Sequence, residues 1–73
     1  VNIRLPKNSS KDLMNEVVSL ANENKGEHLF VVYIPQENGA ERKIVSKKIK
    51  VSNNNQFLIL LRDLLGETNV WID

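Results

Sequence analysis

The chain has 73 residues, with 10 basic side chains, 9 acidic side chains and no cysteine. This length suits one small domain, residues 1–73, because domains usually have roughly 100–150 residues. The lack of cysteine excludes disulfides and thiolate metal sites, and the formal charge of +1 excludes a strongly basic nucleic-acid-binding protein and an acidic tail.

The first third of the chain is predicted to form a short strand and a helix. Residues 2–5 alternate between polar and apolar side chains and stop at a proline, which favours a short strand. Ser9 or Ser10 is expected to cap a helix that runs to about Asn24, and Gly26 is expected to follow it in the left-handed conformation. The apolar side chains at helical spacing are Leu13, Met14, Val17, Val18, Leu20 and Ala21.

A β-hairpin is predicted in the middle of the chain. Residues 28–34 are β-branched, aromatic and apolar on both faces, which indicates a strand covered by helices on one side and partly covered on the other. Asn38 and Gly39 supply the turn, and residues 41–51 form the second arm. The apolar positions of this arm are out of phase on either side of Ser46, which predicts a bulge or a bend there.

The last third is predicted to form a second helix and a short closing strand. Asn53 and Gln56 have the spacing of a capping box. The helix is expected over residues 54–65, where Gly66 ends it, and the strand over residues 69–72. On a helical projection, Leu58 lies at the edge of an apolar face made by Phe57, Leu60, Leu61, Leu64 and Leu65.

The resulting order, β-α-β-β-α-β, predicts an α+β fold of the ferredoxin-like type, with split β-α-β units. Because each helix has one apolar stripe, both helices are expected on the same face of a four-stranded sheet. An incomplete doubly wound α/β sheet is the alternative. No apolar run approaches the ~20 residues of a membrane span, and no signal peptide opens the chain, so we expect a cytoplasmic protein without membrane contact.

No group of residues predicts catalysis or a cofactor. His28 is the single histidine and has no partner that would orient it for base catalysis or complete a metal site. The serines lie outside any nucleophile elbow, and the three glycines are too far apart for a phosphate-binding loop. We therefore expect this domain alone to have no catalytic residues, metal, cofactor or small-molecule substrate.

A basic arm within the predicted hairpin is the first candidate for partner binding. Its positive charges could contact nucleic-acid phosphates or an acidic protein, or they could keep a sheet edge from pairing with other chains. No aromatic residue lies on residues 2–5 or 41–51, the strands on which an RNA-recognition domain presents its stacking residues. The basic residues are Arg42, Lys43, Lys47, Lys48 and Lys50.

Three large apolar or aromatic residues are further candidates. Ile59 points away from the apolar face of its helix, between Arg62 and Asp63, and is either an ordinary exposed residue or a small docking knob. Tyr33 and Trp71 are either core or sheet-face residues or anchors of an interface. We take Ile59 and Arg62, with a second and more electrostatic patch of lysines, as the expected partner-binding positions. That patch is formed by Lys47, Lys48 and Lys50.

Six short segments, distributed over nearly the whole chain, together resemble a known protein family in their order. They are Ile3-Arg4-Leu5-Pro6, Lys25-Gly26, Leu29-Phe30-Val31-Val32-Tyr33-Ile34, Lys48-Ile49-Lys50-Val51-Ser52, Leu64-Leu65-Gly66 and Val70. In this order they resemble the extreme C-terminal domain of the alpha subunit of bacterial DNA polymerase III.

The resemblance implies a non-catalytic protein-interaction module on a DNA-directed DNA polymerase whose chemistry lies in other domains. It implies the tau subunit of the clamp loader as partner. Because the chain starts at Val1 rather than Met, we expect a C-terminal piece of a longer polypeptide. The alternatives are a nucleic-acid-binding module that uses residues 42–50, although we expect weak DNA contact, and a purely structural subdomain.

Overall fold

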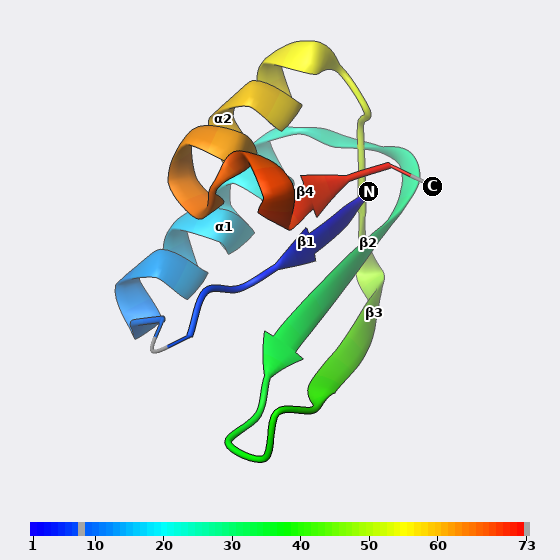
Figure 1. Ribbon diagram of the computed structural model, residues 1–73. Helices are drawn as coiled ribbons and strands as arrows, with labels where there is room; N and C mark the ends of the chain where they lie inside the picture. The colour runs from blue at the N-terminus through cyan, green and yellow to red at the C-terminus, as the bar shows by residue number, and fades with distance from the viewer. Residues whose placement is uncertain (8, 73) are drawn as a thin grey trace.

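Figure 1 shows the computed structural model, which describes residues 1–7 and 9–72. The chain forms an α+β ferredoxin-like arrangement of two helices and a four-stranded mixed sheet, in the predicted order β-α-β-β-α-β. The elements are β1 (Asn2–Arg4), α1 (Lys11–Glu23), β2 (Lys25–Pro35), β3 (Glu41–Val51), α2 (Asn55–Leu65), the 3-10 helix η1 (Glu67–Asn69) and β4 (Val70–Trp71).

The strands are arranged in the order β3-β2-β1-β4. β1 lies parallel to β2 and antiparallel to β4, and β3 lies antiparallel to β2. One of the two predicted split units differs in detail, because β1 and β2 are direct neighbours, whereas β3 and β4 are separated by β2 and β1. The hairpin requires only that β3 lie beside β2. Since β1 occupies one edge of β2, β3 takes the other edge.

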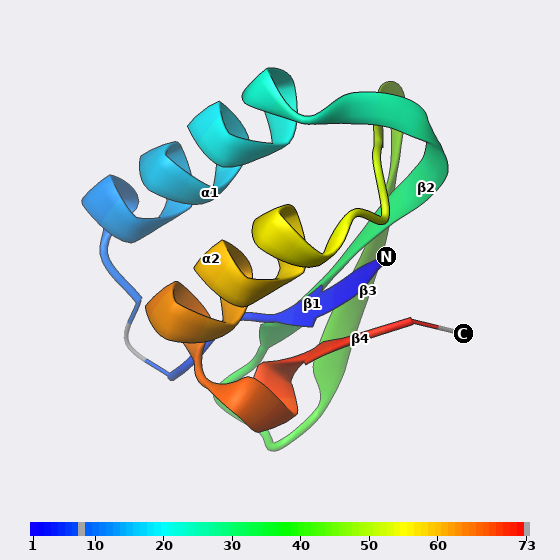
Figure 2. The same ribbon diagram turned by 90° about the horizontal axis from the view of Figure 1, so that it is seen from above.

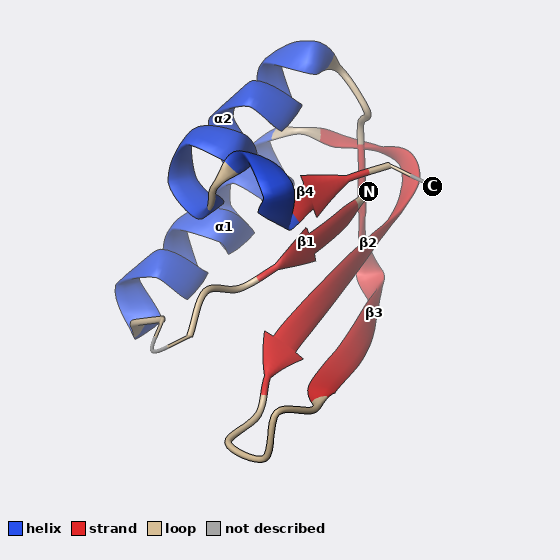
Figure 3. Ribbon diagram, in the orientation of Figure 1, coloured by secondary structure: helices blue, strands red, loops and turns tan. Residues whose placement is uncertain are grey.

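Both helices lie on one side of the sheet, as predicted (Figure 2), and Figure 3 shows the helical and strand layers by colour. The strand order explains this. The connection from β1 to β2 and the connection from β3 to β4 run along opposite strand directions and toward opposite edges of the sheet. Reversing both the strand direction and the edge is the same as a half-turn about the axis perpendicular to the sheet. Such a rotation does not exchange the two faces of the sheet. The usual right-handed crossover therefore places both helices on the same face.

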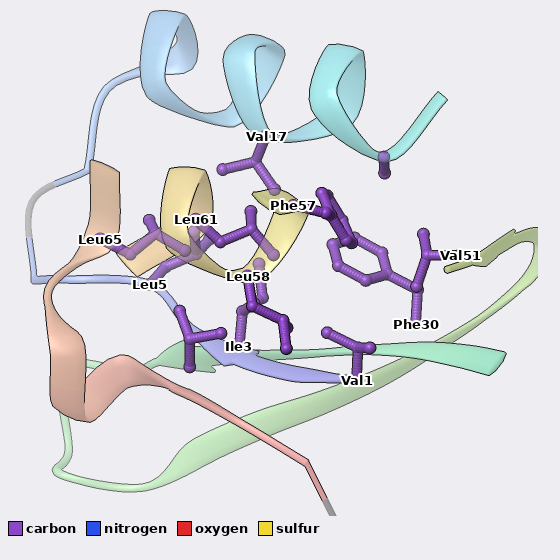
Figure 4. Packing of buried hydrophobic residues seen from close by; sticks show 12 residues of the cluster. Val1, Ile3, Leu5, Val17, Phe30, Val51, Phe57, Leu58, Leu61 and Leu65 are labelled. Atoms are coloured by element: carbon purple, nitrogen blue, oxygen red, sulfur yellow. The ribbon is translucent and has the colours of Figure 1, made fainter. Parts of the chain in front are cut away.

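The core fills the space between the two layers (Figure 4). Its largest fully buried side chains come from elements spread along the chain, namely Ile3 of β1, Val17 of α1, Val51 of β3, and Phe57 and Leu61 of α2. Removal of this apolar surface from water is the main stabilising contribution available to a chain without disulfides.

Helix α2 is rotated relative to the predicted apolar face. Leu58, expected at the edge of that face, is buried, whereas Leu60, expected to be part of the face, is 41% exposed. Ile59 is 55% exposed, as predicted from its position on the helix. The rotation follows from the packing, because β4 contacts α2 on one side and the side toward α1 borders an open groove. Leu64, on that same side, is only partly buried.

Both helices begin with a side-chain cap. The Leu13 N–H donates to Oγ of Ser10 at 3.2 Å, so Ser10 is the N-cap of α1. In α2 the Phe57 N–H donates to Oδ1 of Asn54 at 2.8 Å. The predicted capping box that starts at Asn53 is therefore wrong by one residue. The caps satisfy backbone donors that have no partner within a helix.

Gly26 does not occupy the left-handed position predicted for it. It belongs to β2, and the glycines with positive φ among the described residues are Gly39 and Gly66. Gly26 is needed for space instead, because a Cβ there would lie 2.6 Å from Cα and N of Ser52. The Ser52 N–H also donates to the Asn24 carbonyl at 2.7 Å, which holds the two segments this close.

The predicted irregularity near Ser46 is confirmed. Leu29 pairs with Lys50, but the next residue, Phe30, pairs with Ser46, so the register of β2 and β3 shifts between these two pairs. Within the bulge, the Ile49 N–H donates to Oγ of Ser46 at 3.1 Å. A bulge changes the alternation of side chains along β3. Apolar residues that are out of phase before and after Ser46 can therefore lie on the same face of the sheet.

Candidate interaction surfaces

The first candidate surface lies on α2. Ile59 and Arg62 line one shallow hollow together with Asp63 and Glu67. The structure therefore brings the two predicted residues together, with an exposed apolar side chain beside charged ones. An apolar contact surrounded by charged groups is the usual composition of a protein interface.

The second candidate surface is the basic arm on β3. Lys47, Lys48 and Lys50 are all exposed, and β3 is an edge strand of the sheet. These lysines do not line the hollow of Ile59 and Arg62, so the two predicted patches are separate. Their position on an edge strand fits the protective role of lysine at sheet edges as well as a role in binding.

An aromatic pair lies on the face of the sheet opposite the helices. Tyr33 and Trp71 stack with their ring centroids 5.3 Å apart and an interplanar angle of 29°. The Arg4 guanidinium lies 5.2 Å from the Trp71 ring centroid, and Nζ of Lys43 lies 5.9 Å from that of Tyr33. Arg4 also forms an ion pair with Glu41. The register places these side chains on one face, since Arg4 pairs with Tyr33 and Tyr33 with Lys43.

The sequence did not predict this cluster. Tyr33 and Trp71 are 38 positions apart, and they meet only because β2 and β4 flank β1. Tyr33 and Trp71 were predicted to lie in the core or on the sheet face, and the structure places them on the sheet face. Alternation along each strand gives the face of every residue, but the strand order decides which residues are neighbours.

The third surface is a groove between α1 and α2, which was not predicted from the sequence. It encloses about 500 Å³. The signal that could have indicated it is an apolar stripe on each helix that is wider than the sheet can cover. Its lining consists of Asn15, Glu16, Ser19, Leu20 and Glu23 of α1 and of Leu60, Asp63 and Leu64 of α2.

Residues 1–7 and 9–72 contain no group of three or more histidine or acidic side chains arranged to hold a metal ion. His28 is exposed and lies in β2, where it pairs in register with Val51. No helix in this part of the chain has the length and apolar character required to cross a membrane.

The comparisons with known proteins do not assign the chain to a family. It matches no protein-family model, no curated protein and no solved structure among those compared. The resemblance to the DNA polymerase III alpha subunit therefore rests on the order of the short segments alone.

Proposed function

We propose that the chain is a non-catalytic protein-interaction module at the C-terminus of a bacterial replicative DNA polymerase alpha subunit, acting in the cytoplasm. The clamp-loader tau subunit is its proposed partner. The observation that carries this proposal is the outer surface of the helical layer. Two hollows adjoin there, each with apolar and charged lining, and both include Asp63.

This surface has the composition that a protein partner requires. Ile59 and Leu60 are adjacent, exposed and apolar, and each lines a hollow instead of a flat part of the surface. Ile59 lies in one hollow and Leu60 in the other. Arg62 and Asp63 provide charged groups beside them. A partner would bury the apolar side chains and meet the charges at the rim of the contact.

Titration of the purified chain with tau at physiological ionic strength tests the proposal. Ile59→Asp should weaken tau binding, and because Ile59 is more than half exposed, the variant should keep its fold. Val45→Asp is the matched control, since Val45 is also an exposed β-branched residue but lies on β3. Absence of tau binding would refute the proposed partner. Tau binding that Ile59→Asp leaves unchanged would move the interface elsewhere.

The proposal includes an absence of catalysis. The parent polymerase would carry its chemistry in other domains, so the isolated chain should show neither nucleotide incorporation nor phosphodiester hydrolysis. Metal-dependent turnover that one carboxylate substitution abolishes would overturn this part of the proposal. Each of the exposed carboxylates Glu16, Glu23 and Asp63 is a suitable position for that substitution.

The aromatic pair favours a second candidate function, binding of single-stranded nucleic acid on the open face of the sheet. Aromatic rings flanked by cations are the usual means of stacking bases, and Arg4 and Lys43 lie beside Trp71 and Tyr33. Salt separates the two candidates, because phosphate contacts lose affinity steeply as salt rises. If Trp71→Ala abolished tight, salt-dependent DNA binding, the nucleic-acid function would replace the protein-interaction function.

A further inference from the structure

The groove between α1 and α2 has an apolar floor that the fold does not cover. Leu20, Leu60 and Leu64 belong to the apolar stripes of their helices, yet Leu20 and Leu64 are only partly buried and Leu60 is exposed. These side chains meet in one concave surface, unlike scattered exposed leucines. Concave apolar surfaces with a few polar groups at the rim are typical of binding sites.

The rim of the groove is acidic. Glu16 and Glu23 of α1 and Asp63 of α2 line it and are exposed. None of these three carboxylates forms an ion pair with a residue that the structure describes. The ion pair found among the described residues joins Arg4 to Glu41. Within residues 1–7 and 9–72, no basic side chain lines the groove. The groove therefore combines an open apolar floor with three negative charges that the fold leaves unneutralised.

We propose that this groove binds a basic amphipathic helix of a protein partner. The apolar side chains of the bound helix, at its positions i, i+4 and i+7, would pack on Leu20, Leu60 and Leu64. The Lys and Arg side chains of the same helix would contact the acidic rim of the groove. Helices commonly bind in apolar grooves in this way. The α1 lining runs from Asn15 to Glu23, which is about 12 Å at 1.5 Å per residue, or roughly two turns of the bound helix.

Charge complementarity selects this occupant over the others. A nucleic acid would bring phosphates against three carboxylates, and a second copy of the chain docking through the same groove would bring a second acidic rim. The inference rests on the proposed function in taking the partner to be a protein. It adds the chemistry of the partner segment and places it between the helices, next to the Ile59 hollow.

Synthetic peptides test the inference by fluorescence anisotropy at physiological ionic strength. One peptide of about 18 residues, long enough for partial helicity, has leucine on one face and lysine on the other. A second has glutamate in place of lysine, and a third has the lysine and leucine residues scrambled. We expect the amphipathic basic peptide to bind, and the acidic and scrambled peptides to bind at least about tenfold more weakly.

Paired charge reversals locate the binding site. Glu16→Lys with Glu23→Lys should weaken binding of the basic peptide by about tenfold or more and should allow the acidic peptide to bind. Glu27→Lys with Glu37→Lys makes the same change in net charge at exposed residues outside the groove, and it should change affinity by less than about twofold. Circular dichroism checks that both double variants are folded.

A change on the floor adds a test that does not alter charge. Leu60→Ala should weaken peptide binding by about threefold to tenfold, whereas Leu29→Ala, the same change at an exposed leucine of β2 outside the groove, should not. The inference is overturned if both charge-reversal pairs weaken binding equally, if the scrambled peptide binds as well, or if no peptide binds. It is also overturned if sedimentation shows a dimer that the Glu16 and Glu23 reversals dissociate.

The inference and the proposed function can fail independently. If tau binds the chain and the groove variants do not weaken that binding, the groove inference is wrong while the protein-interaction function stands. If the amphipathic basic peptide binds in the groove but tau does not bind, the groove inference stands and tau is the wrong partner.

Discussion

Replacement of Leu61 by alanine tests the placement of α2 on the sheet. Leu61 is 0% exposed and lies in the core between the layers, so its removal leaves a cavity as well as losing apolar contact (Figure 4). Such changes cost about 2–5 kcal/mol. A chain of this length has a total free energy of unfolding on the order of 4–11 kcal/mol, at about 0.05–0.15 kcal/mol per residue. Leu61→Ala should therefore remove a large fraction of the stability and lower Tm by at least about 8 °C.

Urea denaturation measures this effect with two probes, far-ultraviolet circular dichroism for the helices and the fluorescence of the single tryptophan, Trp71, for the sheet. Coincident transitions would support two-state unfolding. Leu60→Ala is the matched control, because it is the same chemical change one residue earlier at a partly exposed position, and it should cost less than about 1.5 kcal/mol. A loss below about 0.5 kcal/mol for Leu61→Ala, or a larger loss for Leu60→Ala, would refute the placement of α2.

Three further substitutions test local features of the fold by the same urea denaturation. Gly26→Ala should cost about 1–3 kcal/mol, because its Cβ would collide with the Ser52 backbone; a neutral result would show that these segments can separate. Asn54→Ala should cost about 0.5–2 kcal/mol through loss of the α2 N-cap, and Asn54→Asp should retain most of that stability. Glu41→Gln should cost less than about 1 kcal/mol, because the ion pair with Arg4 lies at the surface. A larger loss would give this pair a structural role.

The order of the elements could be predicted from the sequence because each boundary is marked by local chemistry. Pro35 is the last residue of β2, and Pro6 and Gly66 lie within two residues of the ends of β1 and α2. The serine and asparagine caps lie within one residue of the predicted positions. The bulge near Ser46 could also be predicted, since it follows from the phase of apolar residues in one strand. These signals are local and need no knowledge of the neighbouring element.

The strand order and the rotation of α2 could not be predicted in this way. A hairpin and a helix leave open which edge of the sheet each strand occupies, so the direct pairing of β1 with β2 was not determined. The burial of Leu58 and the exposure of Leu60 depend on where the sheet lies below α2. Both residues belong to an apolar stripe about the helix, and periodicity alone does not distinguish a covered side from an open one.

The candidate surfaces also differ in whether the sequence predicts them. The exposure of Ile59 and of the β3 lysines could be predicted, because each depends on one element. The groove and the stacked pair of Tyr33 and Trp71 could not, because each joins residues from two elements whose relative position is set by the whole fold. In this small domain, the surfaces with the most specific chemistry are therefore the ones that need the tertiary structure to be recognised.

The charge distribution shows why the net charge of this chain says little about its partners. The sum of +1 combines acidic side chains on the groove between the helices with basic side chains on an edge strand of the sheet. A sum near zero means a weak field at long range, so no partner is drawn strongly from a distance. At contact the two surfaces differ in sign, and each would select a partner of opposite charge within about a Debye length. If the groove binds a basic segment as proposed, a partner with acidic or phosphate groups on the sheet edge would not compete with it for one site.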